Sequence, residues 1–167
     1  SKGFIEEAEA TRERNEKRYR WEYLGEAVGS GVVPFDNLTV EAGIITDDMV
    51  AQFDNIRQGQ DYGYGPDPYS FVRWHYDKKK NGIYALDELY GQKISNRESA
   101  KWIKSKGYDR HDITADSAEP KSIDEQKNEH GIRRIKGAKK GPESVQYGEE
   151  WLDDLDFIII DPLRTPN

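Results

Sequence analysis

The 167-residue sequence contains no cysteine. This absence excludes thiolate catalysis, zinc–sulfur sites and a disulfide framework, and it fits a reducing compartment. No apolar run approaches the roughly 20 residues that a membrane-spanning helix needs. The Gly-x-x-x-x-Gly-Lys-Ser/Thr spacing of a phosphate-binding loop is also missing, so the sequence offers no visible ATPase site.

Charge is what the sequence has in abundance. Charged residues make up 34% of the chain, hydrophobic residues make up 35%, and the net charge is -7. This balance argues against a protein that simply coats nucleic acid. It does not exclude a nuclease, because cations bound at clustered carboxylates reverse the local field.

The charge pattern divides the chain into two parts. Residues 1–25 mix acids and bases at helical spacings with few apolar positions, which is typical of a connecting helix without its own core. Residues 27–34 are rich in glycine and end in proline, as in a loop. We therefore expect residues 1–34 to be a linker helix and loop from a preceding domain. Residues 35–167 are expected to form one α/β domain.

Residues 38–90 have the pattern of a sheet. Leu38-Thr39-Val40 predicts a short strand, and aromatic and β-branched runs flank Asn81-Gly82, a strong hairpin signal. With the segment ending at Asp61 they predict three consecutive antiparallel strands. Strands and helices then alternate, which implies parallel pairing. The expected helices are 95–103, 120–130 and 142–155, and the expected strands are 109–116, 132–136 and 157–160.

Two isolated carboxylates end two of these predicted strands. Asp61 stands in Gly59-Gln60-Asp61-Tyr62-Gly63, and Asp116 stands where the run Ile113-Thr114-Ala115 breaks into a helix start. Hard divalent cations prefer carboxylate oxygens, and a strand end holds such oxygens rigidly. The pair is therefore a candidate magnesium or manganese site for phosphodiester cleavage.

Each acid also has a simpler interpretation. Asp61 could belong to an ordinary turn, and Asp116 or Ser117 could cap the following helix. Glu88 ends another predicted strand and is a further candidate ligand, although acids at exposed strand ends are common. The histidines His75, His111 and His130 lack metal-ligand spacing and are interpreted as structural.

A basic cluster follows these motifs. It could bind DNA phosphates, or it could be a solvated face of an acidic protein. Its members are Arg133, Arg134, Lys136, Lys139 and Lys140.

The order of these motifs resembles the C-terminal nuclease domain of the tailed-bacteriophage terminase large subunit. The resemblance covers nearly the whole chain and runs through Gly59-Gln60-Asp61-Tyr62-Gly63, Leu86-Asp87-Glu88-Leu89-Tyr90, Ala115-Asp116-Ser117-Ala118-Glu119-Pro120 and Lys136-Gly137-Ala138-Lys139-Lys140-Gly141. It implies an RNase H-like α/β fold, with a mixed central sheet that is first an antiparallel meander and then parallel, flanked by helices.

The resemblance also implies a function. Asp61 and Asp116 would be the first two metal-binding acids of an endonuclease that uses two Mg²⁺ or Mn²⁺ ions to cleave concatemeric double-stranded DNA. The portal protein and small terminase subunit would be partners, in the host bacterial cytoplasm. By the same resemblance, the domain that precedes residues 1–34 would be a packaging ATPase, and residues 35–167 would lack the C-terminal helix of the nuclease domain. In the family that helix carries the third acid, after a histidine in a His-x-x-Asp-Ala segment. No such segment occurs after Asp116, and Asp161 is a poor substitute.

Two alternatives stay open at the level of sequence. One is another RNase H-like nuclease, of the junction-resolvase or transposase type. The other is a non-catalytic module that docks on the portal or the small subunit, with its acids as solvated loop charges.

Overall fold

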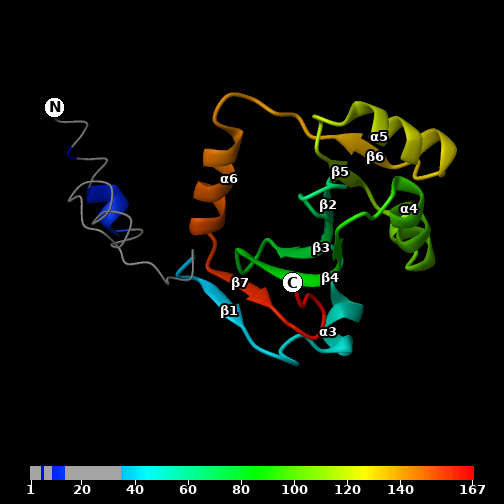
Figure 1. Ribbon diagram of the computed structural model, residues 1–167. Coiled ribbons are helices and arrows are strands. Elements are labelled where there is room, and N and C mark those ends of the chain that lie inside the picture. The colour runs from blue at the N-terminus through cyan, green and yellow to red at the C-terminus, as the bar shows by residue number, and fades with distance from the viewer. Residues whose placement is uncertain (1–4, 6–8, 14–34) are drawn as a thin grey trace.

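The computed structural model describes residues 5, 9–13 and 35–167. Within them, one seven-stranded sheet has the order β1-β7-β4-β3-β2-β5-β6 (Figure 1). Residues 9–13 are helical. Most of the predicted linker, residues 1–34, lies outside the described residues, so its role stays a prediction.

The centre of the sheet is an antiparallel meander, as the sequence predicts. β2 (Ile56–Asp61) pairs with β3 (Tyr69–Asp77), which pairs with β4 (Gly82–Gly91). Asn81 turns the hairpin with a φ of 49°, a left-handed conformation that asparagine tolerates better than most residues. Local turn chemistry therefore sets the hairpin between β3 and β4.

Parallel strands extend the meander on both sides. On one side β5 (Ile113–Ala115) pairs with β2, and β6 (Ile135–Gly137) pairs with β5. On the other side β7 (Phe157–Ile160) lies between β4 and β1 (Leu38–Val40), parallel to both. The predicted mixed sheet is confirmed. β6, however, begins at Ile135 rather than Ile132, whose fully buried side chain packs in the core before the strand starts.

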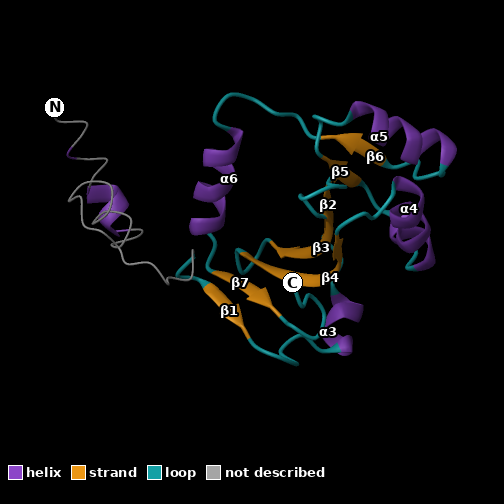
Figure 2. Ribbon diagram, viewed as in Figure 1, coloured by secondary structure: helices purple, strands orange, loops and turns teal. Residues whose placement is uncertain are grey.

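Helices cover both faces of the sheet (Figure 2). α4 (Asn96–Ser105) begins with the predicted capping box between Ser95 and Glu98. After the 3₁₀ turn Tyr108–Arg110 and β5, α5 (Pro120–Asp124) continues into a π-helical turn, Glu125–Glu129. α6 (Ser144–Asp153) lies on the side of the sheet away from α4 and α5, and α3 (Asp47–Gln52) precedes β2. No helix in the described ranges has the length and apolar character needed to cross a membrane.

Two hydrophobic clusters fill the spaces between these layers. The first packs Ile103 of α4 against Phe71 and Ile113 of the sheet. The second packs Leu155, after α6, against Ile83 and Ile158. The two clusters lie on opposite faces of the sheet. Successive side chains of β2 and β5 therefore point in turn toward α4 and toward the face of the sheet that carries α6.

Asp161 is not a metal-site residue in this fold but a structural anchor. It is 1% exposed, and its carboxylate accepts backbone N–H bonds from Gly43 (3.0 Å), Ile45 (3.1 Å) and Leu163 (3.0 Å). These bonds, led by that of Gly43, hold its pKa below the usual value. Asp161 therefore ties the end of β7 to the loop after β1.

We expect the Asp161→Asn variant to have a lower Tm at pH 7, by on the order of 5 °C, because the three N–H groups lose a charged acceptor. A folded-state pKa below the unfolded one stabilises the protein above about pH 4, and this contribution disappears as the pH falls through the folded-state value. The Tm difference between wild type and variant should therefore shrink toward pH 3 in thermal unfolding followed by circular dichroism. Asp156→Asn, at an exposed site, is the control, and a pH-independent Tm difference for Asp161→Asn would contradict the assignment.

Candidate functional site

The two predicted acids lie side by side at the ends of adjacent parallel strands. Gly59 pairs with Thr114 and Gln60 with Ala115, so the next residue of each strand is Asp61 or Asp116. The Asp116 N–H continues this ladder by donating to the Gln60 carbonyl at 3.0 Å. Asp61 and Asp116 therefore occupy neighbouring positions, about one strand spacing of 5 Å apart, at the same edge of the sheet.

The side chains of Asp61 and Asp116 lie on the face of the sheet opposite α4. Gln58 and Gln60 are buried beneath the helices, whereas Asp61 is exposed, as is Thr114 two residues before Asp116. Because side chains alternate along a strand, Asp61 shares the face of Gly59, and Asp116 shares the face of Thr114. The same face carries a pocket of about 470 Å³, lined partly by Gly59, Thr114 and the cations Arg57 and Lys136.

Asp116 is held in a defined orientation by its own turn. Its Oδ1 accepts the N–H of Ala118 at 2.9 Å, and the same oxygen forms an ion pair with Lys140 Nζ. The contact with Lys140 is the main reason that the pKa of Asp116 lies below its usual value. The alternative that Asp116 or Ser117 caps the next helix is wrong, because Glu119 is the N-cap of α5 and no side chain bonds there.

Glu88 lies on the same face but is not brought to the pair. It is opposite Val72, which in turn is opposite Gly59, so two strand spacings, about 10 Å, separate Glu88 from β2. Its carboxylate instead accepts bonds from the backbone and side-chain N–H groups of Asn167 at 2.8 and 2.9 Å. Across the described part of the chain, no three His, Asp or Glu side chains form a preassembled metal cluster.

The basic cluster lies along the sheet edge formed by β6: Arg133 and Arg134 precede the strand, Lys136 is in it, and Lys139 and Lys140 follow it. Arg134 and Lys136 form ion pairs with Asp112, at 2.7 and 3.8 Å, so part of the cluster is neutralised within the domain. Arg133 and Lys139 are exposed and make no ion pair within the described ranges. DNA binding by this cluster stays a prediction.

The histidines make protein contacts. His75 is buried and stacks on Phe53 with ring centroids 4.1 Å apart, and burial lowers its pKa. His130 pairs with Glu125 at 3.0 Å. The pKa of His111 is lowered, by burial and then by the nearby Arg73 guanidinium.

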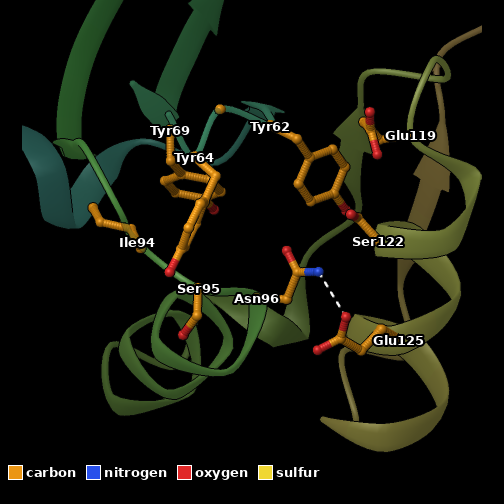
Figure 3. Close-up of a pocket in the computed structure, with 10 residues that line it drawn as sticks. Tyr62, Tyr64, Tyr69, Ile94, Ser95, Asn96, Glu119, Ser122 and Glu125 are labelled. Carbon is orange, nitrogen blue, oxygen red and sulfur yellow. Dashed lines mark hydrogen bonds between the residues drawn. The ribbon is translucent and has the colours of Figure 1, made fainter. Parts of the chain in front are cut away.

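A second pocket, of about 360 Å³, lies next to the acids on the helix side (Figure 3). The tyrosines Tyr62, Tyr64 and Tyr69 contribute to its wall. Its opposite wall includes Asn96, which donates to Glu125 at 2.8 Å. Tyr62 directly follows Asp61, so this pocket lies at the end of β2, next to Asp61.

A buried polar network beneath this pocket escapes sequence analysis. Gln126, fully buried in the π-helical turn, accepts from Gln60 at 2.6 Å and from Tyr62 at 2.8 Å, and donates to Ser99 at 2.8 Å. Burial raises the pKa of the Tyr62 hydroxyl. The network fixes the residues on both sides of Asp61. A glutamine among charged neighbours resembles a surface residue, so no sequence signal marks it.

A mixed sheet with an antiparallel centre, parallel outer strands and helices on both faces has the arrangement of an RNase H-like domain. The family model "Terminase RNAseH like domain" matches residues 61–167, and the chain belongs to this family.

Known relatives agree with this assignment. The chain is 66% identical to the large terminase subunit of Bacillus phage SPP1 over all 167 residues, and it spans 40% of that protein. It is 35% identical, over 92 residues, to the PBSX phage terminase large subunit of Bacillus subtilis strain 168, a match covering 54% of the chain and 21% of that protein.

Solved structures give the same result. The SPP1 large terminase nuclease domain with bound Mn matches with a TM-score of 0.78 and 64% identity, over 81% of this chain and 76% of that one. The large terminase of thermophilic bacteriophage D6E matches with a TM-score of 0.61 over 95% of this chain and 41% of that one. Its 13% identity makes it a likeness of fold alone.

We expect Gln126→Ala to destabilise the domain by about 2–4 kcal/mol, because it leaves a cavity and removes a hydrogen-bond partner from each of Gln60, Tyr62 and Ser99. Urea unfolding measures this loss. Gln146→Ala, at an exposed site on α6, is the matched control and should change stability by less than about 0.5 kcal/mol. Equal effects of the two substitutions would contradict the role of Gln126.

Proposed function

We propose that this domain is the metal-dependent endonuclease of a viral genome-packaging motor, and that it cleaves concatemeric double-stranded DNA. The observation that carries the proposal is the convergence of Asp61 and Asp116 on one exposed face of the sheet. The bound Mn of the SPP1 nuclease domain, 64% identical to this chain, supports a divalent metal. The portal protein and small terminase subunit are proposed partners, and the host bacterial cytoplasm is the proposed location.

The donor set fits hard divalent cations. Asp61 and Asp116 lie on neighbouring strand ends, and two carboxylates placed so close repel each other unless a proton or a cation lies with them. Their oxygens are the ligands that Mg²⁺ and Mn²⁺ prefer. Asp61 and Asp116 would hold two such ions together with a third acid, which is expected from the family resemblance.

The protein's own part in the reaction is positioning. Asp61 is fixed by the β2–β5 ladder and by the anchored neighbours Gln60 and Tyr62. Asp116 is oriented by the Ala118 N–H. When bound, divalent ions supply positive charge that stabilises an in-line displacement at phosphorus. No side-chain nucleophile is required, in keeping with a chain that has no cysteine.

We expect Asp61→Asn to abolish Mn²⁺ binding, because the amide has no charge to offer the ion. Substitution of a residue that only supports a metal ligand typically lowers activity roughly 10–100-fold. We expect the loss of plasmid cleavage in Asp61→Asn to be larger than this. Calorimetric Mn²⁺ titration and agarose-gel cleavage measure the two effects. Asp67→Asn, an exposed aspartate on the loop after β2, is the control.

Wild-type Mn²⁺ affinity in Asp61→Asn would refute the metal assignment and favour a docking module. Preferential cleavage of four-way junctions over linear duplex would instead favour a resolvase-type nuclease.

A further inference from the structure

Lys140 places a positive charge next to Asp116, one member of the acid pair Asp61 and Asp116. Its ammonium group forms an ion pair with Asp116 Oδ1, the oxygen that also accepts the Ala118 N–H. The side chains of Lys140 and Asp116 are 53% and 25% exposed, so the contact lies at the surface, where a divalent ion can reach it. The lysine therefore neutralises one of two carboxylates that would otherwise repel each other.

The backbone around Lys140 is held against the turn that carries Asp116. The Ala138 N–H donates to the Ala115 carbonyl at 2.8 Å, which fixes the loop two residues before the lysine. At Gly137 a Cβ would come within 3.3 Å of Ser117 Cβ, so the two segments approach each other closely. Lys140 thus reaches the acid pair from a neighbouring, anchored segment.

Other cations nearby do not share this position. Arg134 and Lys136 pair with Asp112 instead. Lys139 is adjacent in the chain and exposed, and makes no ion pair within the described residues. The loop therefore presents two successive lysines, of which one contacts the acid pair.

We propose that Lys140 is a tethered counter-ion of the metal site, which occupies Asp116 in the metal-free protein and is displaced when a divalent cation binds. This inference rests on the proposed metal-dependent function. An ammonium group is a single flexible point charge, and a half-exposed ion pair is weak, so a divalent ion can displace it. The apparent metal affinity is the intrinsic affinity multiplied by the fraction of molecules in which the carboxylate is free of the lysine.

The test is a titration with Mn²⁺ alone, at pH 7 and low salt, with free Mn²⁺ measured by electron paramagnetic resonance. We expect Lys140→Gln to bind Mn²⁺ about three- to tenfold more tightly than wild type, because the competing charge is gone. Lys140→Arg keeps the charge and should stay near wild type. Lys139→Gln removes the same charge from the same loop without touching Asp116, so it controls for net charge.

Thermal unfolding gives a second readout. Without metal, Lys140→Gln should have a lower Tm than Lys139→Gln, because its acid pair lacks a counter-ion. Added Mn²⁺ should then raise the Tm of Lys140→Gln by more than that of wild type.

Equal Mn²⁺ affinity in Lys140→Gln and Lys139→Gln would overturn the counter-ion assignment, and weaker binding by Lys140→Gln would do so as well. Neither of these two results would contradict the proposed nuclease function, provided that wild type binds Mn²⁺ and Asp61→Asn does not. Absence of Mn²⁺ binding in wild type and in Lys140→Gln alike would refute both.

Discussion

The parallel pairing of β2 with β5 is the constraint on which the site depends. It brings Asp61 and Asp116 together although 55 positions separate them, as their residue numbers show. A shift of one residue in this register would send Asp116 to the opposite face, because side chains alternate along a strand. Ile113 and Ala115 prevent that shift, since both are buried in the core beneath α4 and would have to exchange places with the exposed Thr114.

The core beneath the helices thus determines the chemistry on the other face. Gln60 is a direct link, because its carbonyl accepts the Asp116 N–H while its side chain bonds to Gln126. The π-helical turn brings Gln126 into the core, and turns of this kind are rare and often lie at functional sites. The backbone positions of the two acids are therefore set by the residues before them, Gln60 and Ala115, which are both buried.

Local patterns in the sequence predict what local physics determines. Asn81-Gly82 marks the hairpin, Ser95 and Glu98 mark the start of α4, and the acids are visible because each follows a strand pattern. The partners of β7 are not visible in this way. Its pairing with β1 joins Leu38 to Ile158, and no local signal specifies a contact across such a separation. The sequence gives no signal for Gln126 and marks Lys140 only as a member of a basic cluster, because their contacts join segments distant in the chain.

Both edge strands of the sheet are short. Within the described part of the chain, the outermost strands are Leu38–Val40 and Ile135–Gly137, each three residues long, and Lys136 lies in the middle of the second. Edge strands this short offer a foreign strand too few backbone groups to extend the sheet, and Lys136 adds a charge at one of them. At high concentration, neighbouring molecules would therefore contact one another through side chains rather than by adding a strand to the sheet. The short edges thus oppose amyloid-like stacking.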